Sequence, residues 1–389
     1  MTNRLPFAER KSPWRGVLDL ATGCYPPFLF GGGLGRWLPV FHFHEARPDA
    51  LEPYFVYLAE NGYRSVTSAA IAAFVRRGIH PGPRSVALCF DDAWASLWIV
   101  VAPLLRRFGL QAIAYVSPAH VPSAAVPRPQ WEEGSAAPAP GLDRSDCPFA
   151  TWPELRALHA SGAVDIQAHS WRHATVFCDA TPVDFVRPGY QPHPHLYPWA
   201  DTPSGERFVT AADLGAPLYP VRSRLSDALR FRHPAAFDAG VRHVRGHGSA
   251  AFFERPDWRA GLQACVRAAG DGRFETAAER DAAIREDLGS AREILNAELH
   301  TDTVRHMCFP FSVAGAAAGR IAPEVGYETA FADRLFGARG VRASDNPYRL
   351  MRLKHPYLFC LPGRGRRWFF SAGTRSASAP DRAAPHGHH

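Results

Sequence analysis

Two neighbouring carboxylates, Asp91 and Asp92, follow directly on an apolar run at residues 85–90. Adjacent negative charges repel each other, and a bound cation or a shared proton relieves that repulsion. The pair could therefore hold a metal or carry out acid–base chemistry. The competing interpretation is a helix cap, because either aspartate could start a helix over residues 94–108. Taken alone, the Asp–Asp pair favours the cap.

A second candidate set consists of two histidines four residues apart, His169 and His173. Neutral imidazole nitrogens bind divalent metals when a carboxylate completes the set. The spacing by itself is weak evidence, because His243 and His247 share it within an Arg-rich stretch. For that second pair exposed loop histidines are the favoured interpretation. For His169 and His173 exposure is the weaker alternative, because they follow an apolar run, as the aspartates do.

The elements around these residues predict how they come together. Apolar runs that are typical of buried strands alternate with segments of helical periodicity, which indicates a parallel α/β architecture. The expected strands are residues 38–44, 85–90, 112–116, 164–168, 304–309, 329–331 and 348–353. The expected helices are residues 51–60, 67–77, 94–108, 152–160, 321–326 and one that starts after a capping box, Thr276 to Glu279.

In an α/β barrel the carboxyl ends of the strands meet on one rim, so the aspartates and the histidine pair should face each other there. His42 and His44 alternate along the first strand and therefore point to one face, where hydrogen-bonded core histidines are the favoured interpretation. Residues 122–148 are expected to form a surface loop. Residues from about 179 to 275 show no regular period and are expected to form a loop-rich insert.

The expected domain plan has an extension at residues 1–37, a barrel at 38–370 that contains the insert, and a flexible tail at 371–389. The 389 residues are enough for one large barrel of this kind. Seven scattered cysteines without a Cys-x-x-Cys pair argue against a disulfide framework and a zinc knuckle. No signal peptide or membrane span is recognised, so a soluble cytoplasmic protein is expected.

The net charge of +7, mostly from arginine, favours acidic partners such as anionic glycans or lipid headgroups. Peripheral contact with a membrane therefore stays open. Nucleic acid is a minor option, because no basic motif interleaved with aromatic residues is present.

The motifs together resemble the polysaccharide deacetylases of carbohydrate esterase family four, which have the NodB-homology fold. The resemblance rests on Phe-Asp-Asp at residues 90–92, His-Ser-x-x-His at 169–173 and Phe-Pro-Phe at 309–311, each after a strand. Phe43-His44, Asn61-Gly62-Tyr63 and Gly326-Tyr327 also fit. It covers roughly residues 38–180 and 280–355 and implies a distorted (β/α)7-type barrel with one large insert.

The resemblance implies that Asp91 is the catalytic base and that Asp92, His169 and His173 hold a divalent metal, most often zinc. A backbone N–H in the turn of Pro310 and Phe311 would stabilise the oxyanion. Ser170 would support the histidine pair. Leu353-Lys354-His355 resembles the late Leu-x-His motif of the family, which makes His355 a candidate general acid, with a structural role as the equal alternative.

This sequence also departs from the family pattern. Ala93 replaces the glycine after Asp-Asp, which perturbs a turn but removes no ligand. Many members of the family have an arginine just before the motif x-Pro-Tyr. The corresponding residue in this sequence is Cys308, so the usual arginine contact to the base is expected to be missing. The stretch 187–190 resembles that motif superficially but follows His173 too closely.

The implied activity is removal of an N-acetyl group from an amino sugar of a polysaccharide or glycoconjugate precursor. The alternatives are an amidohydrolase acting on a small non-sugar amide and a catalytically silent glycan-binding protein. Arginines are concentrated in the insert, and they suggest a lid that recognises an anionic sugar substrate. A solvated, loop-rich face is the competing interpretation. These arginines are Arg222, Arg224, Arg230, Arg232, Arg242 and Arg245.

Overall fold

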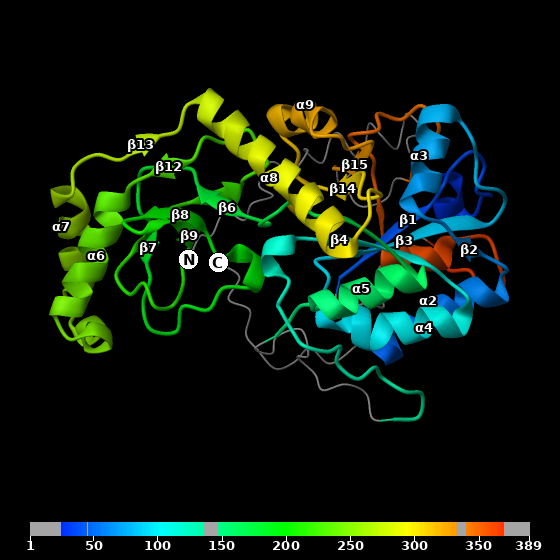
Figure 1. The fold of residues 1–389 in the computed structure, drawn as a ribbon, viewed down its shortest axis with the longest axis horizontal. Coiled ribbons are helices and arrows are strands. Elements are labelled where there is room, and N and C mark those ends of the chain that lie inside the picture. Colours follow the sequence, from blue (N-terminus) through cyan, green and yellow to red (C-terminus); the bar gives the residue numbers. More distant parts are fainter. Residues whose placement is uncertain (1–24, 45, 136–146, 333–339, 369–389) are drawn as a thin grey trace.

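The computed structural model describes residues 25–44, 46–135, 147–332 and 340–368 (Figure 1). The predicted tail at 371–389 and most of the predicted extension at 1–37 lie outside these ranges. Every cysteine within them is a free thiol, as the scattered spacing predicted. Within the same ranges, no helix combines the length and the apolar character needed to cross a bilayer.

A curved parallel sheet forms the centre of the molecule, which confirms the predicted fold class. Its order is β15-β14-β5-β4-β3-β1-β16, with β2 beside β3, and all of these neighbours run parallel. The strands are β1 (Val40–Phe43), β2 (Arg64–Ser65), β3 (Ser85–Asp91), β4 (Ala112–Val116), β5 (Val164–Ala168), β14 (His306–Cys308), β15 (Thr329–Phe331) and β16 (Leu353–Lys354).

Helices cover the outer face of this sheet (Figure 1). They are α2 (Pro48–Glu60), α4 (Ala102–Phe108), α5 (Trp152–Ser161), α8 (Ala277–Leu299) and α9 (Ala316–Glu324). Helix α3 (Ser68–Arg77) instead packs Ile71, Phe74 and Val75 into the apolar layer on the other face. A π-helical stretch, η2 (Leu97–Val101), leads into α4, so the predicted helix at 94–108 forms in two parts. The predicted capping box of Thr276 and Glu279 is present at the start of α8.

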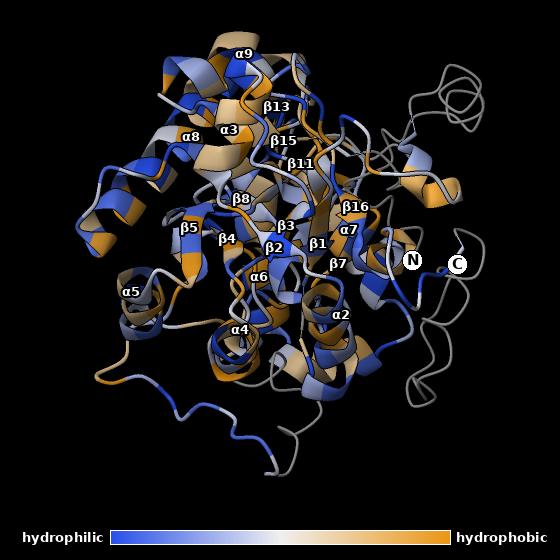
Figure 2. Ribbon diagram, turned by 90° about the vertical axis from the view of Figure 1, so that its right-hand side faces the viewer, coloured by the Kyte–Doolittle hydropathy of each residue, from blue (hydrophilic) through white to orange (hydrophobic). Residues whose placement is uncertain are grey.

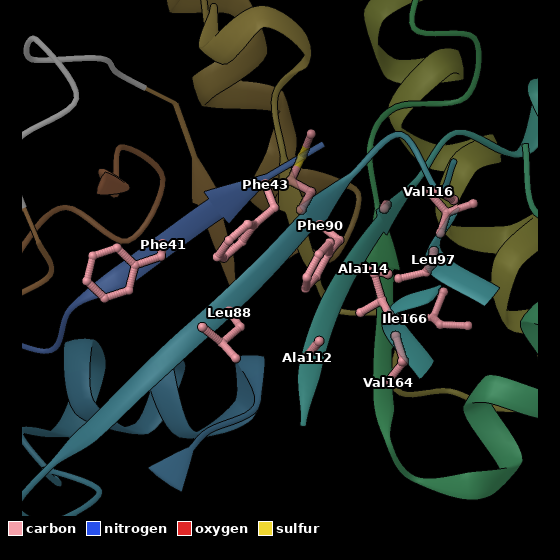
Figure 3. Packing of buried hydrophobic residues seen from close by; sticks show 14 of the residues in the cluster. Phe41, Phe43, Leu88, Phe90, Leu97, Ala112, Ala114, Val116, Val164 and Ile166 are labelled. Atoms are coloured by element: carbon pink, nitrogen blue, oxygen red, sulfur yellow. The ribbon is translucent and has the colours of Figure 1, made fainter. Parts of the chain in front are cut away.

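Alternate residues of the strands build two apolar layers, which is why the strands read as continuous apolar runs. Figure 3 shows Phe41 and Phe43 of β1 beside Leu88 and Phe90 of β3 in the larger layer, which packs against the helices. Ala87, Cys89, Ile113 and Tyr115 belong to the layer on the other face. In Figure 2 the covering helices α2, α4 and α5 carry both hydrophobic and hydrophilic residues, as amphipathic surface helices do.

The insert is more regular than the sequence predicted. It lies to one side of the sheet (Figure 1) and contains helices and short antiparallel strand pairs. Its elements are β7 (Asp184–Phe185), η5 (Pro194–Leu196), β8 (Trp199–Thr202), β9 (Gly205–Phe208), β10 (Pro217–Leu218), β11 (Val221–Ser223), β12 (Phe231–Arg232), α6 (Pro234–Gly246), η6 (Ser249–Glu254), α7 (Trp258–Ala268) and β13 (Arg273–Phe274). Helix α6 buries Phe237, Gly240 and Val244, a helical spacing that the sequence analysis missed.

Contacts on both sides join the insert to the sheet-bearing part. Strand β11 pairs with β6 (Thr175–Phe177), which follows the histidine pair. The carboxylate of Asp227 accepts hydrogen bonds from the backbone N–H groups of Ala316 (2.9 Å) and Ala317 (3.2 Å), at the start of α9. These N–H groups have no partner within their own helix, so Asp227 caps it.

Two predictions near the C-terminus were inaccurate. The expected strand at 348–353 is reduced to β16, because residues 340–352 run mostly as irregular chain with single bridges at Val341 and Leu350. The expected helix at 321–326 begins earlier, as α9, because its N-terminus is set by Asp227, which lies far away in the sequence.

Candidate functional site

The carboxyl ends of β3, β5 and β14 bring the predicted site residues together on one rim. Donor atoms of Asp92, His169 and His173 lie within 4.8 Å of one another, and all three side chains are buried. Asp92 follows β3 in a left-handed conformation with φ 71°, and Ala93 continues it with φ 50°. The backbone therefore turns sharply after the strand and keeps both aspartates at its end instead of starting a helix.

A third histidine, which the sequence analysis missed, completes the cluster. The Nε2 atoms of His169, His173 and His195 lie 3.4, 3.5 and 3.5 Å from Oδ1 of Asp92. His195 comes from η5 in the insert. The only sequence signal was the run His193-Pro194-His195, within a stretch that is rich in histidine throughout.

The histidine loop, residues 169–173, is held from several sides. Nδ1 of His169 lies 2.6 Å from the carbonyl oxygen of Cys308, so the ring presents Nε2 to Asp92. The backbone N–H of His173 donates to Oγ of Ser170 at 3.0 Å, and both residues have positive φ angles. Asp287 of α8 accepts from the backbone N–H of Arg172 at 3.1 Å. The loop is thus fixed in a strained conformation.

Burial and mutual contact set the protonation of the cluster. Burial lowers the pKa of His195 to about 3. Burial, together with the charge of His195, lowers the pKa of His173 well below its ordinary value. Burial would raise the pKa of Asp92, but the surrounding histidines outweigh it and hold that pKa well below the usual range. The carboxylate of Asp92 therefore faces neutral imidazoles at His173 and His195, the form in which histidine binds a metal. Burial would lower the pKa of His169 as well, but its contacts with Asp92 and with the carbonyl oxygen of Cys308 outweigh burial and raise that pKa well above its ordinary value.

This donor set fits a divalent metal. Oδ1 of Asp92 is buried without a hydrogen-bond partner, as are both ring nitrogens of His195. Unsatisfied buried polar atoms are costly, about 1–3 kcal/mol each, so such a group indicates a missing ligand. One carboxylate oxygen and several imidazole nitrogens are ligands that zinc accepts.

Asp91 has a different environment. Arg352, just before β16, donates from Nη1 to Oδ1 at 2.6 Å and from Nη2 to Oδ2 at 2.7 Å, and both side chains are buried. Burial alone would raise the pKa of Asp91, but the guanidinium outweighs it and lowers the pKa well below its ordinary value. The prediction that an arginine contact to the base is missing was therefore wrong. The contact comes from the segment just before β16.

His42 and His44 share one face, as predicted, and their donor atoms lie close to those of Asp91. The interpretation as core histidines fits the buried His42 but is wrong for His44, which follows β1 and is exposed. Nε2 of His44 lies 3.9 Å from Oδ2 of Asp91, and the His44 side chain is 46% exposed. The donor atoms of these three residues lie close enough together to form a second candidate cation group. However, both oxygens of Asp91 already accept hydrogen bonds from the Arg352 cation, which disfavours a further cation there.

The remaining predicted residues lie around this centre. The turn η7 (Pro310–Ser312) follows β14, and the ring of Phe311, with φ 58°, packs 4.6 Å from that of His173. Pro310 is buried at the start of the same turn. His355 stacks on Phe43 at 5.2 Å between ring centroids, and burial lowers its pKa to about 4. Its general-acid role stays a prediction.

His243 and His247 lie apart from this centre, on α6 of the insert. Their rings are 4.3 Å apart, and Nδ1 of His247 contacts the carbonyl oxygen of His243 at 2.8 Å. Neither belongs to the candidate metal groups found among the described residues. The predicted loop is the last turn of α6, with His247 as its exposed C-cap residue, so the pair was correctly kept apart from the metal candidates but wrongly assigned to a loop.

The arginines of the insert are mostly engaged by carboxylates. Arg224 donates to both oxygens of Glu275, at 2.7 and 3.1 Å, and this pair is buried. Arg230, Arg232 and Arg242 form ion pairs within the insert. Their partners are Glu206, Asp201 and Asp238 respectively. These contacts do not support the predicted lid for an anionic substrate, because such guanidinium groups already have anionic partners.

The region of the chain that matches known proteins contains residues of this site. The polysaccharide deacetylase family model matches residues 78–187. The poly-beta-1,6-N-acetyl-D-glucosamine N-deacetylase of Escherichia coli (strain K12) is 30% identical over 140 residues, which are 36% of this chain and 20% of that protein. The protein of the same name from Escherichia coli O157:H7 matches equally. The match thus spans about a fifth of the length of these curated relatives.

Solved structures are similar over a longer part of the chain. The BpsB deacetylase domain of Bordetella bronchiseptica is 19% identical and covers 83% of this chain and 96% of its own, with a TM-score of 0.47. IcaB from Ammonifex degensii is 14% identical and covers 82% of this chain and 92% of its own, with a TM-score of 0.46. The family match includes the carboxylate pair and the histidine loop. Residues 78–187 are therefore similar to the polysaccharide deacetylase family.

Proposed function

We propose that the protein is a metal-dependent hydrolase that removes the N-acetyl group from an amino sugar in a polysaccharide or glycoconjugate. The observation that carries this proposal is the position of Oδ1 of Asp92, buried among imidazole nitrogens 3.4 to 3.5 Å away, beside an Asp91 that Arg352 holds. A metal group and a separate carboxylate on one rim are what amide hydrolysis by an activated water requires.

In this proposal Asp92, His169 and His173 hold the metal, and zinc is the preferred ion because the ligands are imidazole and carboxylate. A divalent ion there would polarise the acetamide carbonyl and lower the pKa of bound water. The protein supplies the rest. The bond from Nδ1 of His169 to Cys308 and the bond from the backbone of His173 to Ser170 orient the rings before substrate arrives.

Asp91 is the proposed base. Arg352 keeps its carboxylate ionised, and each oxygen, although it accepts one hydrogen bond from the guanidinium, has a second lone pair free to accept a proton from the attacking water. The guanidinium also fixes the plane of the carboxylate. Arg352 is thus a positioning residue for the proton transfer and not itself an acid.

The turn of Pro310 and Phe311 is the proposed oxyanion site, where a backbone N–H of Phe311 stabilises the tetrahedral species. His355 is the proposed general acid that protonates the leaving amine, which yields acetate and a free amino sugar. Because burial lowers its pKa to about 4 in the free protein, this role requires that bound substrate raise that pKa. The packing of Phe311 against His173 supports the first assignment, because it keeps the turn beside the metal group.

The relatives suggest which substrate to test first. The Escherichia coli proteins are named for N-deacetylation of poly-β-1,6-N-acetyl-D-glucosamine. We therefore propose an N-acetylglucosamine polymer or oligomer as the substrate class. The surface charge does not require an anionic sugar, since most arginines of the insert have carboxylate partners.

The test is acetate release from β-1,6-linked N-acetylglucosamine oligomers, with β-1,4-linked oligomers and a small cyclic amide as comparison substrates. Release of acetate by the protein loaded with zinc, and its loss in Asp92→Ala and Asp91→Asn, are the expected results. Turnover of the cyclic amide alone would favour the small-amide amidohydrolase. Absence of any hydrolysis with bound zinc present would leave the glycan-binding alternative.

A further inference from the structure

His195 of the insert is placed like a metal ligand. Its side chain is 4% exposed, and its Nε2 lies 3.5 Å from Oδ1 of Asp92. Its ring centroid is 4.2 Å from that of His173. Phe149 and Trp94 pack around it, with ring centroids at 5.0 and 5.4 Å. The ring thus points at the same carboxylate oxygen of Asp92 that His169 and His173 face.

The backbone around His195 fixes this position. The residue sits in the middle of η5, where the backbone N–H of Leu196 donates to the carbonyl oxygen of His193 at 2.7 Å. A few residues later Pro198 forms a bridge to Thr175 and accepts a hydrogen bond from Val209 at 2.9 Å. The bridge ties the insert to the segment that follows the histidine loop on the C-terminal side of this turn.

A purely structural role does not account for the ring. Buried imidazoles in folded proteins nearly always have a hydrogen-bond partner, yet neither nitrogen of His195 has one. Leaving both unsatisfied would cost about 1–3 kcal/mol each. A cation shared with Asp92 would satisfy Nε2 of His195 and Oδ1 of Asp92, which is also unpartnered.

We propose that His195 is a fourth protein ligand of the metal group, supplied by the insert. This inference rests on the proposed function, which assigns only Asp92, His169 and His173. Together the four residues offer one carboxylate and three imidazoles, enough to complete a tetrahedral zinc site. Catalytic zinc sites keep one position for water or substrate, and His195 would take that position in the resting protein.

The consequence is that the insert takes part in the reaction. The aspartate and the histidine loop follow strands of the sheet, whereas His195 lies on a separate segment. Substrate must therefore exchange with His195 or raise the coordination number to five. The insert then regulates access to the metal by a direct bond and not by covering the site alone.

The experiment compares metal binding in the full chain with His195→Ala and His193→Ala. His193 is an exposed neighbour two residues away, so its substitution is the matched control. Zinc affinity is measured by competition with a chromophoric chelator, and the coordination of cobalt(II) by its visible absorption. Circular dichroism of the metal-free proteins checks the fold, and His195→Gln serves as a second variant should the alanine variant not fold.

We expect the zinc dissociation constant to rise about tenfold or more in His195→Ala, by comparison with supporting groups whose loss costs 10–100-fold. The cobalt absorption should change as well, and His193→Ala should match the unmodified protein. Unchanged affinity and an unchanged cobalt spectrum in a folded His195 variant would overturn this inference alone. A failure of the unmodified protein to bind zinc or cobalt would overturn the proposed function and this inference with it.

Discussion

Arg352 and Asp91 form a buried pair in which each carboxylate oxygen accepts one hydrogen bond, at 2.6 and 2.7 Å, across 261 residues of sequence. The pair joins β3 to the segment that leads into β16, with β1 between the two strands. Its position explains how the Asp–Asp repulsion is resolved. Asp91 is neutralised by the guanidinium, and Asp92 faces the imidazoles, so the neighbouring charges have different partners.

The first prediction concerns this pair. Arg352→Met leaves the charge of Asp91 buried and unpaired, which should lower the free energy of unfolding by about 3–5 kcal/mol. Urea unfolding monitored by circular dichroism measures the loss. The double variant Arg352→Met/Asp91→Asn removes the unpaired charge and should recover much of that stability while acetate release stays abolished. A double variant as unstable as the single one would contradict the assigned pairing.

The second prediction concerns metal removal. Chelation should lower the unfolding temperature of the protein, and zinc should restore it, because the buried carboxylate of Asp92 and its imidazoles are better satisfied with a cation present. Saturation to 100 times the dissociation constant stabilises the folded state by about 2.7 kcal/mol. In Asp92→Ala the unfolding temperature should no longer respond to zinc. An equal response in this variant would place the bound metal elsewhere.

The local parts of the site could be predicted because they depend on short stretches of sequence. The run that ends in Asp91 and Asp92 reads as a strand that carries both carboxylates to a rim, and it forms β3. His169 and His173 follow β5 in the same way. In each case the alternation of strand and helix, together with a single motif, was enough to predict where the site residues lie.

The predictions that failed concern contacts between segments that are distant in the sequence. Arg352 reaches Asp91 only because β16 pairs with β1. His195 reaches Asp92 only because the insert folds back over the histidine loop. Neither pairing leaves a periodic signal around the residue itself. Helix α6 was a different kind of failure, because its apolar spacing was present but was obscured by small and basic residues.

The third prediction tests His355 as the general acid, with His44 as the comparison. If His355 protonates the leaving amine, His355→Phe should lower kcat about 10²–10⁴-fold while the unfolding temperature changes little, since phenylalanine can keep the stacking on Phe43. His44→Ala is the matched comparison, because Nε2 of His44 lies 3.9 Å from Asp91 on the exposed side. A loss confined to the His44 variant would transfer the role from His355 to His44.

The fourth prediction concerns Asp287, which braces the histidine loop from α8. Burial raises the pKa of Asp287 from 3.8 to about 6, although its Oδ1 accepts the backbone N–H of Arg172. Between these pH values the folded protein binds the proton more tightly than the unfolded chain does. Stability from this group is therefore full below about pH 4 and is lost as the pH rises through 6, by roughly 3 kcal/mol.

Asp287→Asn should remove the loss of folding stability that occurs as the pH rises. The asparagine keeps an oxygen that can accept from Arg172 and carries no charge, and it also replaces the buried, unpartnered Oδ2 with a donor. We expect the variant to be more stable than the unmodified protein at pH 7.5, by up to about 3 kcal/mol, with little difference at pH 4. Urea unfolding of both proteins in chelator, at the two pH values, measures this. A stability difference that does not depend on pH would show that Asp287 titrates normally and that the histidine loop is braced by an ordinary carboxylate.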